Sequence, residues 1–152
     1  MDRAYRWFVF LMFGPLVIGG VGMAVFFYRE FNNPKMQAVN ALVDTVYEHR
    51  QAGDAEAILT LLQEGGNARF DRAAEKQSFK AALAAVEKRF GKLVKVAEVN
   101  YQYIDDEEFT DVDVKVKLKL ERRVNFSEEL KIRYHHAKGV AQLTAYQFEG
   151  FR

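Results

Sequence analysis

The chain contains no cysteine among its 152 residues. Disulfide bonds, thiolate nucleophiles and cysteine-ligated metal sites are therefore excluded, and so is a lipid anchor attached to a cysteine. The sequence also lacks a glycine-rich phosphate loop, a serine nucleophile elbow and the interleaving of aromatic and basic residues that is typical of nucleic-acid binding. These absences count against an enzyme of a familiar hydrolase or nucleotide-binding class.

The chain has no excess of charge of either sign. Its 22 lysines and arginines nearly balance its 21 aspartates and glutamates, which leaves a formal net charge of +1. A protein that binds nucleic acid normally carries a basic surface that offsets the phosphate charge. Nucleic acid is therefore not an expected partner.

One long apolar run stands near the N-terminus. Residues 7–28 contain no charged side chain, and as a helix they would span roughly 33 Å, about the thickness of a bilayer's hydrocarbon core. The run continues past the small-x-small site at residues 22–24, which is unlike a cleaved signal peptide. Arg3 and Arg6 precede it, while Arg29 and Lys35 follow it, so the charge bias toward a cytoplasmic N-terminus is slight. A short flank that leads directly into the span is the usual signal-anchor arrangement, which also favours this orientation. We therefore expect a flank over residues 1–6, a transmembrane anchor over 7–28, a linker over 29–34 and a soluble domain over 35–152. This organisation predicts a single-pass inner-membrane protein whose domain is periplasmic or otherwise extracytoplasmic.

Three apolar stripes with helical spacing follow the anchor. They predict helices over about 34–50, 54–64 and 74–90. Asn33 and Pro34 suit the first helix start, and Asp54 suits the cap of the second. Gly91 suits the left-handed conformation that closes the third.

After Gly91 the apolar residues recur at every second position, which indicates strands over 93–103, 111–121, 126–135 and 140–148. The alternation shifts near Val96 and Ala97, so we expect a β-bulge there. In the last strand, Tyr146 is expected on one face and Leu143 on the other. The predicted fold class is α+β, with a single N-terminal transmembrane helix followed by three helices packed on a curved four-stranded antiparallel sheet.

The order of these elements resembles a known superfamily. A helix, the junction Ala52-Gly53-Asp54, two more helices and then Phe90-Gly91-Lys92-Leu93 leading into a meander resemble the nuclear transport factor 2-like (cystatin-like) cone domains, over residues 34–152. The chain is also similar to the membrane-anchored members in bacterial envelopes, such as the inner-membrane scaffold subunits of type IV secretion systems. The resemblance implies a sheet wrapped around the helices, with an opening that is a ligand pocket, an active site or a closed core. It selects no single function, because the superfamily includes isomerases, dehydratases, carriers and interaction modules.

A pocket inside such a domain would need polar groups on the inner face of the sheet. The candidates are Tyr103, Glu128, Tyr134 and Tyr146. Glu128 is the one carboxylate on an otherwise apolar strand face, and a base opposite tyrosine donors is the arrangement an isomerase needs. We expect instead that Glu128 lies at the open end of the sheet, where water reaches it. No residue matches the isomerase pattern at recognisable spacing, so no catalytic residue and no cofactor is predicted.

Three features suggest metal binding at first sight. His135 and His136 are neighbours on a strand, so their side chains point to opposite faces and cannot chelate one ion. His49 lies near the end of a helix, where it complements the dipole. The acidic turn at residues 105–108 lacks the spacing of a calcium loop. No metal site is predicted.

A row of basic side chains on the exposed face of the sheet is the candidate partner surface. It comprises Lys115, Lys117, Lys119, Lys131 and Arg133. Asp113, Glu121 and Glu129 interrupt it, which favours a mixed-charge soluble surface over a dedicated site. The sequence thus predicts a membrane-anchored, non-catalytic binding or assembly module for a protein partner in or at the membrane, with a homo-oligomer as a further option. The alternative is a small-molecule carrier or isomerase-like enzyme; a core filled by Phe79, Leu83, Phe126 and Tyr146 would favour the module, and a deep cavity would favour the alternative.

Overall fold

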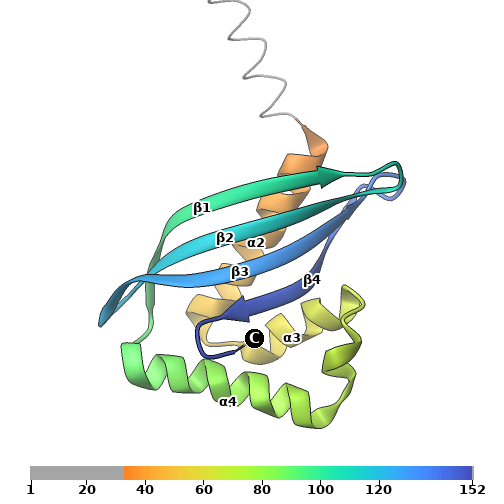
Figure 1. Ribbon diagram of the computed structural model, residues 1–152. Helices are drawn as coiled ribbons and strands as arrows, with labels where there is room; N and C mark the ends of the chain where they lie inside the picture. The colour runs from red at the N-terminus through yellow and green to blue at the C-terminus, as the bar shows by residue number, and fades with distance from the viewer. Residues whose placement is uncertain (1–32, 152) are drawn as a thin grey trace, which may run out of the picture. The chain divides into compact units, whose positions relative to one another are not determined.

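The described part of the chain begins with helices and ends with strands. The computed structural model describes residues 33–151 (Figure 1). Its elements in chain order are α2 (Pro34–Ala52), α3 (Ala55–Glu64), the 3-10 helix η1 (Ala68–Asp71), α4 (Ala73–Phe90), β1 (Leu93–Asp105), β2 (Phe109–Leu120), β3 (Arg123–His135) and β4 (Val140–Phe148). The α+β class predicted for the soluble domain is confirmed, with its three α-helices and four strands.

The predicted fold class also included a membrane-spanning helix, and this part is corrected by the structure. Within residues 33–151 no helix is long and apolar enough to cross a bilayer. The segment 7–28, for which the span was predicted, lies outside the described residues, as do the flank 1–6 and most of the linker 29–34. The inner-membrane location depends on those residues and stays a prediction.

The predicted helix ends are set by local hydrogen bonds. The Asp54 side chain accepts a hydrogen bond from the backbone N–H of Ala57 at 3.0 Å, as expected of an N-cap. Gly91 has a φ of 84°, and its N–H bonds to the Glu87 carbonyl, which closes α4. Between α3 and α4 the chain forms the short helix η1.

The four strands form one antiparallel meander in the order β1-β2-β3-β4 (Figure 1). Burial alternates along β2: its even-numbered residues from Thr110 to Leu120 are buried, and its odd-numbered residues from Phe109 to Lys119 are half-buried or exposed. One face of the sheet is therefore the inner face, which packs on the helices, and the other is the outer face. The inner residues join Val43, Phe79 and other helix residues in a single core.

Bulges adjust which residues face inward. The register of β1 on β2 shifts at Val94 and at Ala97, which confirms the bulge predicted near Val96. Another bulge lies in β4, where Lys131 pairs with Ala145 but Ile132 pairs with Leu143, so that Thr144 is the extra residue. Leu143 and Tyr146 are therefore both buried on the inner face. Their predicted placement on opposite faces was wrong because the bulge reverses the alternation.

Candidate functional site

A cluster of polar side chains lies inside the core. Arg50 comes from the last turn of α2, Glu128 from β3 and Tyr146 from β4. The Nε of Arg50 lies 3.3 Å from Oε1 of Glu128, and both side chains have 0 % exposed surface. The Tyr146 hydroxyl donates a 2.5 Å hydrogen bond to Oε2 of the same carboxylate. Both carboxylate oxygens of Glu128 are thus occupied.

Arg50 has a second acidic partner. Its Nη1 lies 3.1 Å from Oε1 of Glu87 on α4, whose side chain is partly exposed. Its Nη2 is buried and has no hydrogen-bond partner among the described residues. The guanidinium therefore connects the end of α2 to both α4 and the sheet, and one of its donors remains unsatisfied.

Burial dominates the electrostatics of the cluster. It raises the pKa of Glu128, while the charge of Arg50 and the hydrogen bond from Tyr146 act in the opposite direction. Burial and the Glu128 carboxylate raise the pKa values of Tyr47 and Tyr146 well above the usual tyrosine range. Burial alone would lower the pKa of Arg50, but the charge of Glu128 and its other contacts raise it overall. Both tyrosines are therefore neutral, and Tyr146 donates to a carboxylate that a guanidinium also holds.

The structure brings together only two of the four pocket candidates. Glu128 and Tyr146 are in contact, but Tyr134 lies six positions further along β3 (134 − 128), a distance of about 20 Å on an extended strand. Tyr103 lies on β1 in the row of Val112 and is half-buried. The expectation that water reaches Glu128 was wrong, because the residue is 3 % exposed. The four residues do not line one common pocket.

Apolar side chains occupy the space around the cluster. Phe79, Leu83, Phe126 and Tyr146 are all buried, with 3 % exposure at most. The Phe79 ring meets the rings of Tyr146 at 5.7 Å and Phe148 at 5.8 Å in edge-on contacts. This is the filled core that the sequence associates with a binding module rather than with a carrier or an enzyme.

Sequence reasoning missed Arg50, although a signal for it was present. The buried residues of α2 include Val39, Val43 and Val46, and the next position of that stripe at helical spacing is 50. A basic residue in the last turn of a helix is usually exposed to solvent, where its charge stabilises the negative end of the helix dipole. Arg50 fits that common interpretation, so its place on the buried stripe was overlooked. The combination of an arginine and a glutamate at two core positions predicts that they pair.

The outer face of the sheet carries a ladder of ion pairs between neighbouring strands. Arg133 binds Asp111 through two hydrogen bonds, of 2.8 and 3.0 Å. Lys117 lies 2.7 Å from Glu98, and Lys131 lies 3.6 Å from Asp113. Three of the five candidate partner residues are thus paired within the domain. Lys115 and Lys119 form no ion pair with any described residue.

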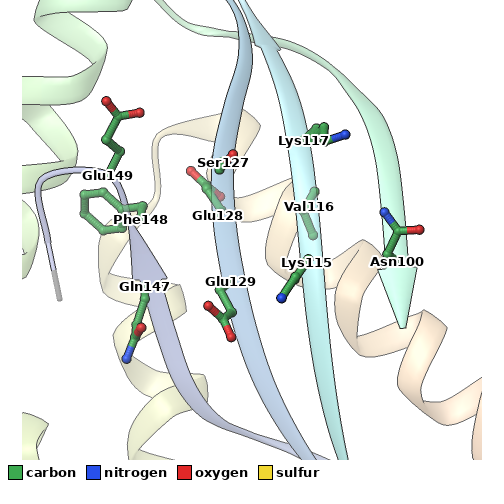
Figure 2. Close-up of a pocket in the computed structure, with 10 residues that line it drawn as sticks. All are labelled: Asn100, Lys115, Val116, Lys117, Ser127, Glu128, Glu129, Gln147, Phe148 and Glu149. Atoms are coloured by element: carbon green, nitrogen blue, oxygen red, sulfur yellow. The ribbon is translucent and has the colours of Figure 1, made fainter. Parts of the chain in front are cut away.

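A hollow of about 630 Å³ lies on this outer face (Figure 2). Across it, Asn100, Lys115, Glu129 and Gln147 lie in register on the four successive strands. Lys117 and Ser127 form the next row. The Lys115 ammonium therefore has two amide side chains and a carboxylate in its surroundings, all reached from the outer side of the sheet.

The histidines make separate contacts. His135 Nε2 lies 3.0 Å from the Gln142 side-chain oxygen, and His136 Nε2 lies 3.1 Å from the Thr110 hydroxyl. Within residues 33–151, no three histidine or carboxylate side chains gather in a way that could hold a metal ion.

Comparisons of the chain with protein families, with curated proteins and with solved structures found no match. The resemblance to the nuclear transport factor 2-like superfamily therefore stays a prediction.

Proposed function

We propose that residues 38–151 form a non-catalytic binding or assembly module, which engages a protein partner through the outer face of its sheet. The observation that carries this proposal is the location of the hollow. It lies on the outer face around Lys115 and Glu129, whereas buried side chains fill the space between the helices and the sheet. Attachment to a membrane would add local concentration to this contact, but the proposal does not require it.

The state of Glu128 supports a binding module over an isomerase-like enzyme. A general base must come within hydrogen-bond distance of the proton that it removes. Both oxygens of Glu128 are held by Arg50 and Tyr146, and its side chain has no exposed surface. This carboxylate therefore serves the packing of α2 on the sheet.

The chemistry of the outer face fits a polar protein surface. Lys115 is exposed and unpaired among the described residues, and Glu129 faces it on β3. Because the neighbouring cations Lys117 and Lys131 are already neutralised, Lys115 is the cation best placed to meet an acidic group of the partner. Charge pairs at such a rim contribute to specificity and association rate more than to affinity.

A photoreactive amino acid placed at position 115 of the full-length chain in its own cells tests this proposal. We expect one stoichiometric protein adduct from position 115, and we expect Lys115→Glu to lower recovery of that partner about tenfold. The matched control is Lys138, which is exposed on the turn before β4. A photoreactive group at position 138 should give no adduct, and Lys138→Glu should leave recovery unchanged. Equal capture at both positions, or recovery unaffected by Lys115→Glu, would contradict the proposal.

A further inference from the structure

The two edges of the sheet differ in what covers them. At the β4 edge, the segment after α3 lies against the strand, and Asn67 Nδ2 donates to the Thr144 carbonyl at 2.7 Å. At the opposite edge, β1 pairs with β2 alone among residues 33–151 and is the outermost strand (Figure 1). The backbone groups on the outer side of an edge strand are a template for pairing with another strand. β1 is therefore the open edge of this domain.

β1 is also long and only partly covered. It has 13 residues, and Leu93 alone among them is fully buried. On its inner face, Val99 and Tyr101 pack against the core and remain half-exposed. Val96 and Ile104 are 37 % and 53 % exposed. A strand added along β1 would remove this apolar surface from water, which favours association.

Unpaired charges of opposite sign lie at the two ends of β1. At its start, Lys92 and Lys95 are exposed, and Lys95 lies opposite Lys119 of β2. At its end, the turn into β2 exposes Glu107 and Glu108. Within the described part of the chain, no ion pair is formed by any of these side chains: Lys92, Lys95, Lys119, Glu107 and Glu108. The open edge is thus positive at one end and negative at the other.

We propose that a second copy of this chain pairs with the first along β1, antiparallel and in a register centred on Asn100. In this register the positions that face each other sum to 200, which brings the start of one β1, with Lys92 and Lys95, close to the acidic turn of the other copy, with Glu107 and Glu108. Val99 faces Tyr101, and both lie on the inner face, opposite Val116 and Val114 of β2. Each contact occurs twice because a two-fold interface is self-complementary.

The same features disfavour an unrelated strand. Bulges at Val94 and Ala97 and the exposed charges of Lys95 and Glu98 are devices that keep arbitrary strands from adding to an edge. A second copy offsets the charge of Lys95, because antiparallel pairing brings its acidic turn to the basic start of β1. The charge pattern therefore selects a copy of the same chain and an antiparallel orientation.

Charge reversal in the full-length chain, kept in a mild detergent, tests this pairing. One variant, Lys92→Glu/Lys95→Glu, makes the start of β1 acidic, and the other, Glu107→Lys/Glu108→Lys, makes the turn basic. We expect the wild type to be a dimer in sedimentation analysis and each variant alone to dissociate about tenfold more readily, since like charges then meet at both ends. A mixture of the two variants restores opposite charges at both ends, so it should form a heterodimer. A monomeric wild type would overturn the proposal, and so would variants that dimerise as well as the wild type. Variants would do so if the copies associated through residues 7–28 instead of β1.

Cross-linking locates the interface. Because the chain has no cysteine, Asn100→Cys introduces a single thiol at the proposed two-fold centre, and we expect it to form a disulfide between copies. Ser127→Cys places the thiol on the outer face of β3, away from the edge, and should remain reduced. Equal oxidation of both variants would overturn the register. This interface does not use Lys115, so Lys115→Glu should leave self-association unchanged. Partner recovery therefore tests the surface around Lys115, and self-association separately tests the pairing along β1.

Discussion

Arg50 and Glu128 are a buried ion pair, and its energetics differ from those of the pairs on the outer face. Removing two charges from water costs several kcal/mol per ion, which the mutual attraction and the added hydrogen bonds only offset. The arrangement is therefore not in itself a source of large stability. The stability of the domain is instead sensitive to substitution of either residue, because loss of one partner leaves the other charge buried without its counterpart.

A double-mutant cycle tests this view of the pair. We expect Arg50→Met to lower the free energy of unfolding by about 3–5 kcal/mol, and Glu128→Gln to act in the same direction. The double variant Arg50→Met/Glu128→Gln should recover most of the loss, because no unpaired charge then remains. Denaturant unfolding of the four proteins measures the coupling.

A surface pair provides the comparison for this cycle. Lys117 and Glu98 are 49 % and 47 % exposed at their side chains, so Lys117→Met should cost less than about 1 kcal/mol. If the double variant in the core were as unstable as the sum of its single substitutions, the two residues would not be energetically coupled.

At the scale of elements, the contact of α3 with β4 depends on one glycine. Gly65 has an ordinary helical φ of −74°, so its backbone does not require glycine. A Cβ at this position, however, would lie 1.9 Å from the Leu143 carbonyl oxygen. The absent side chain lets the end of α3 approach the backbone of β4.

We expect Gly65→Ala to destabilise the domain by about 1–3 kcal/mol, because α3 must move away from β4 to admit the methyl group. Thermal or denaturant unfolding measures the loss, and hydrogen exchange should accelerate in β4. The adjacent Gly66 has a φ of +78° and open space around it, so Gly66→Ala should cost about 1 kcal/mol, from backbone strain alone. Faster exchange in β4 for Gly66→Ala, with none for Gly65→Ala, would refute this account.

The elements themselves could be predicted from sequence because their signals are local. The cap at Asp54, the closing Gly91 and the strict alternation of β2 each depend on a few neighbouring residues. The contacts between elements depend on distant positions. The bulge at Thr144, which brings Leu143 to the face of Tyr146, is visible only in the pairing of β4 with β3. The same holds for the pairing of Arg50 with Glu128, which are 78 positions apart.

At the scale of the whole molecule, two kinds of carboxylate influence stability in opposite directions as pH changes. Burial raises the pKa of Glu128; the folded state therefore binds its proton more readily than the unfolded chain does, and this contribution to stability is lost as pH rises. Hydrogen bonds from Lys117 and Arg133 lower the pKa values of Glu98 and Asp111. Their contributions are present above the ordinary pKa values and are lost as pH falls.

The contribution of Glu128 can be isolated by comparing the wild type with Arg50→Met/Glu128→Gln, which lacks the titrating carboxyl. We expect the unfolding free energy of the wild type minus that of this variant to be largest below the ordinary glutamate pKa of 4.5. This difference should decline as pH rises through the raised pKa of Glu128. The unfolding free energy of the wild type minus that of Asp111→Asn should instead increase as pH rises from acid. Added salt should weaken this increase, because the ion pair of Asp111 with Arg133 is partly exposed. Urea unfolding across a pH series measures both differences. Differences that changed with pH in the same direction would mean that the buried carboxyl titrates like a surface one, and that water reaches it in the folded protein.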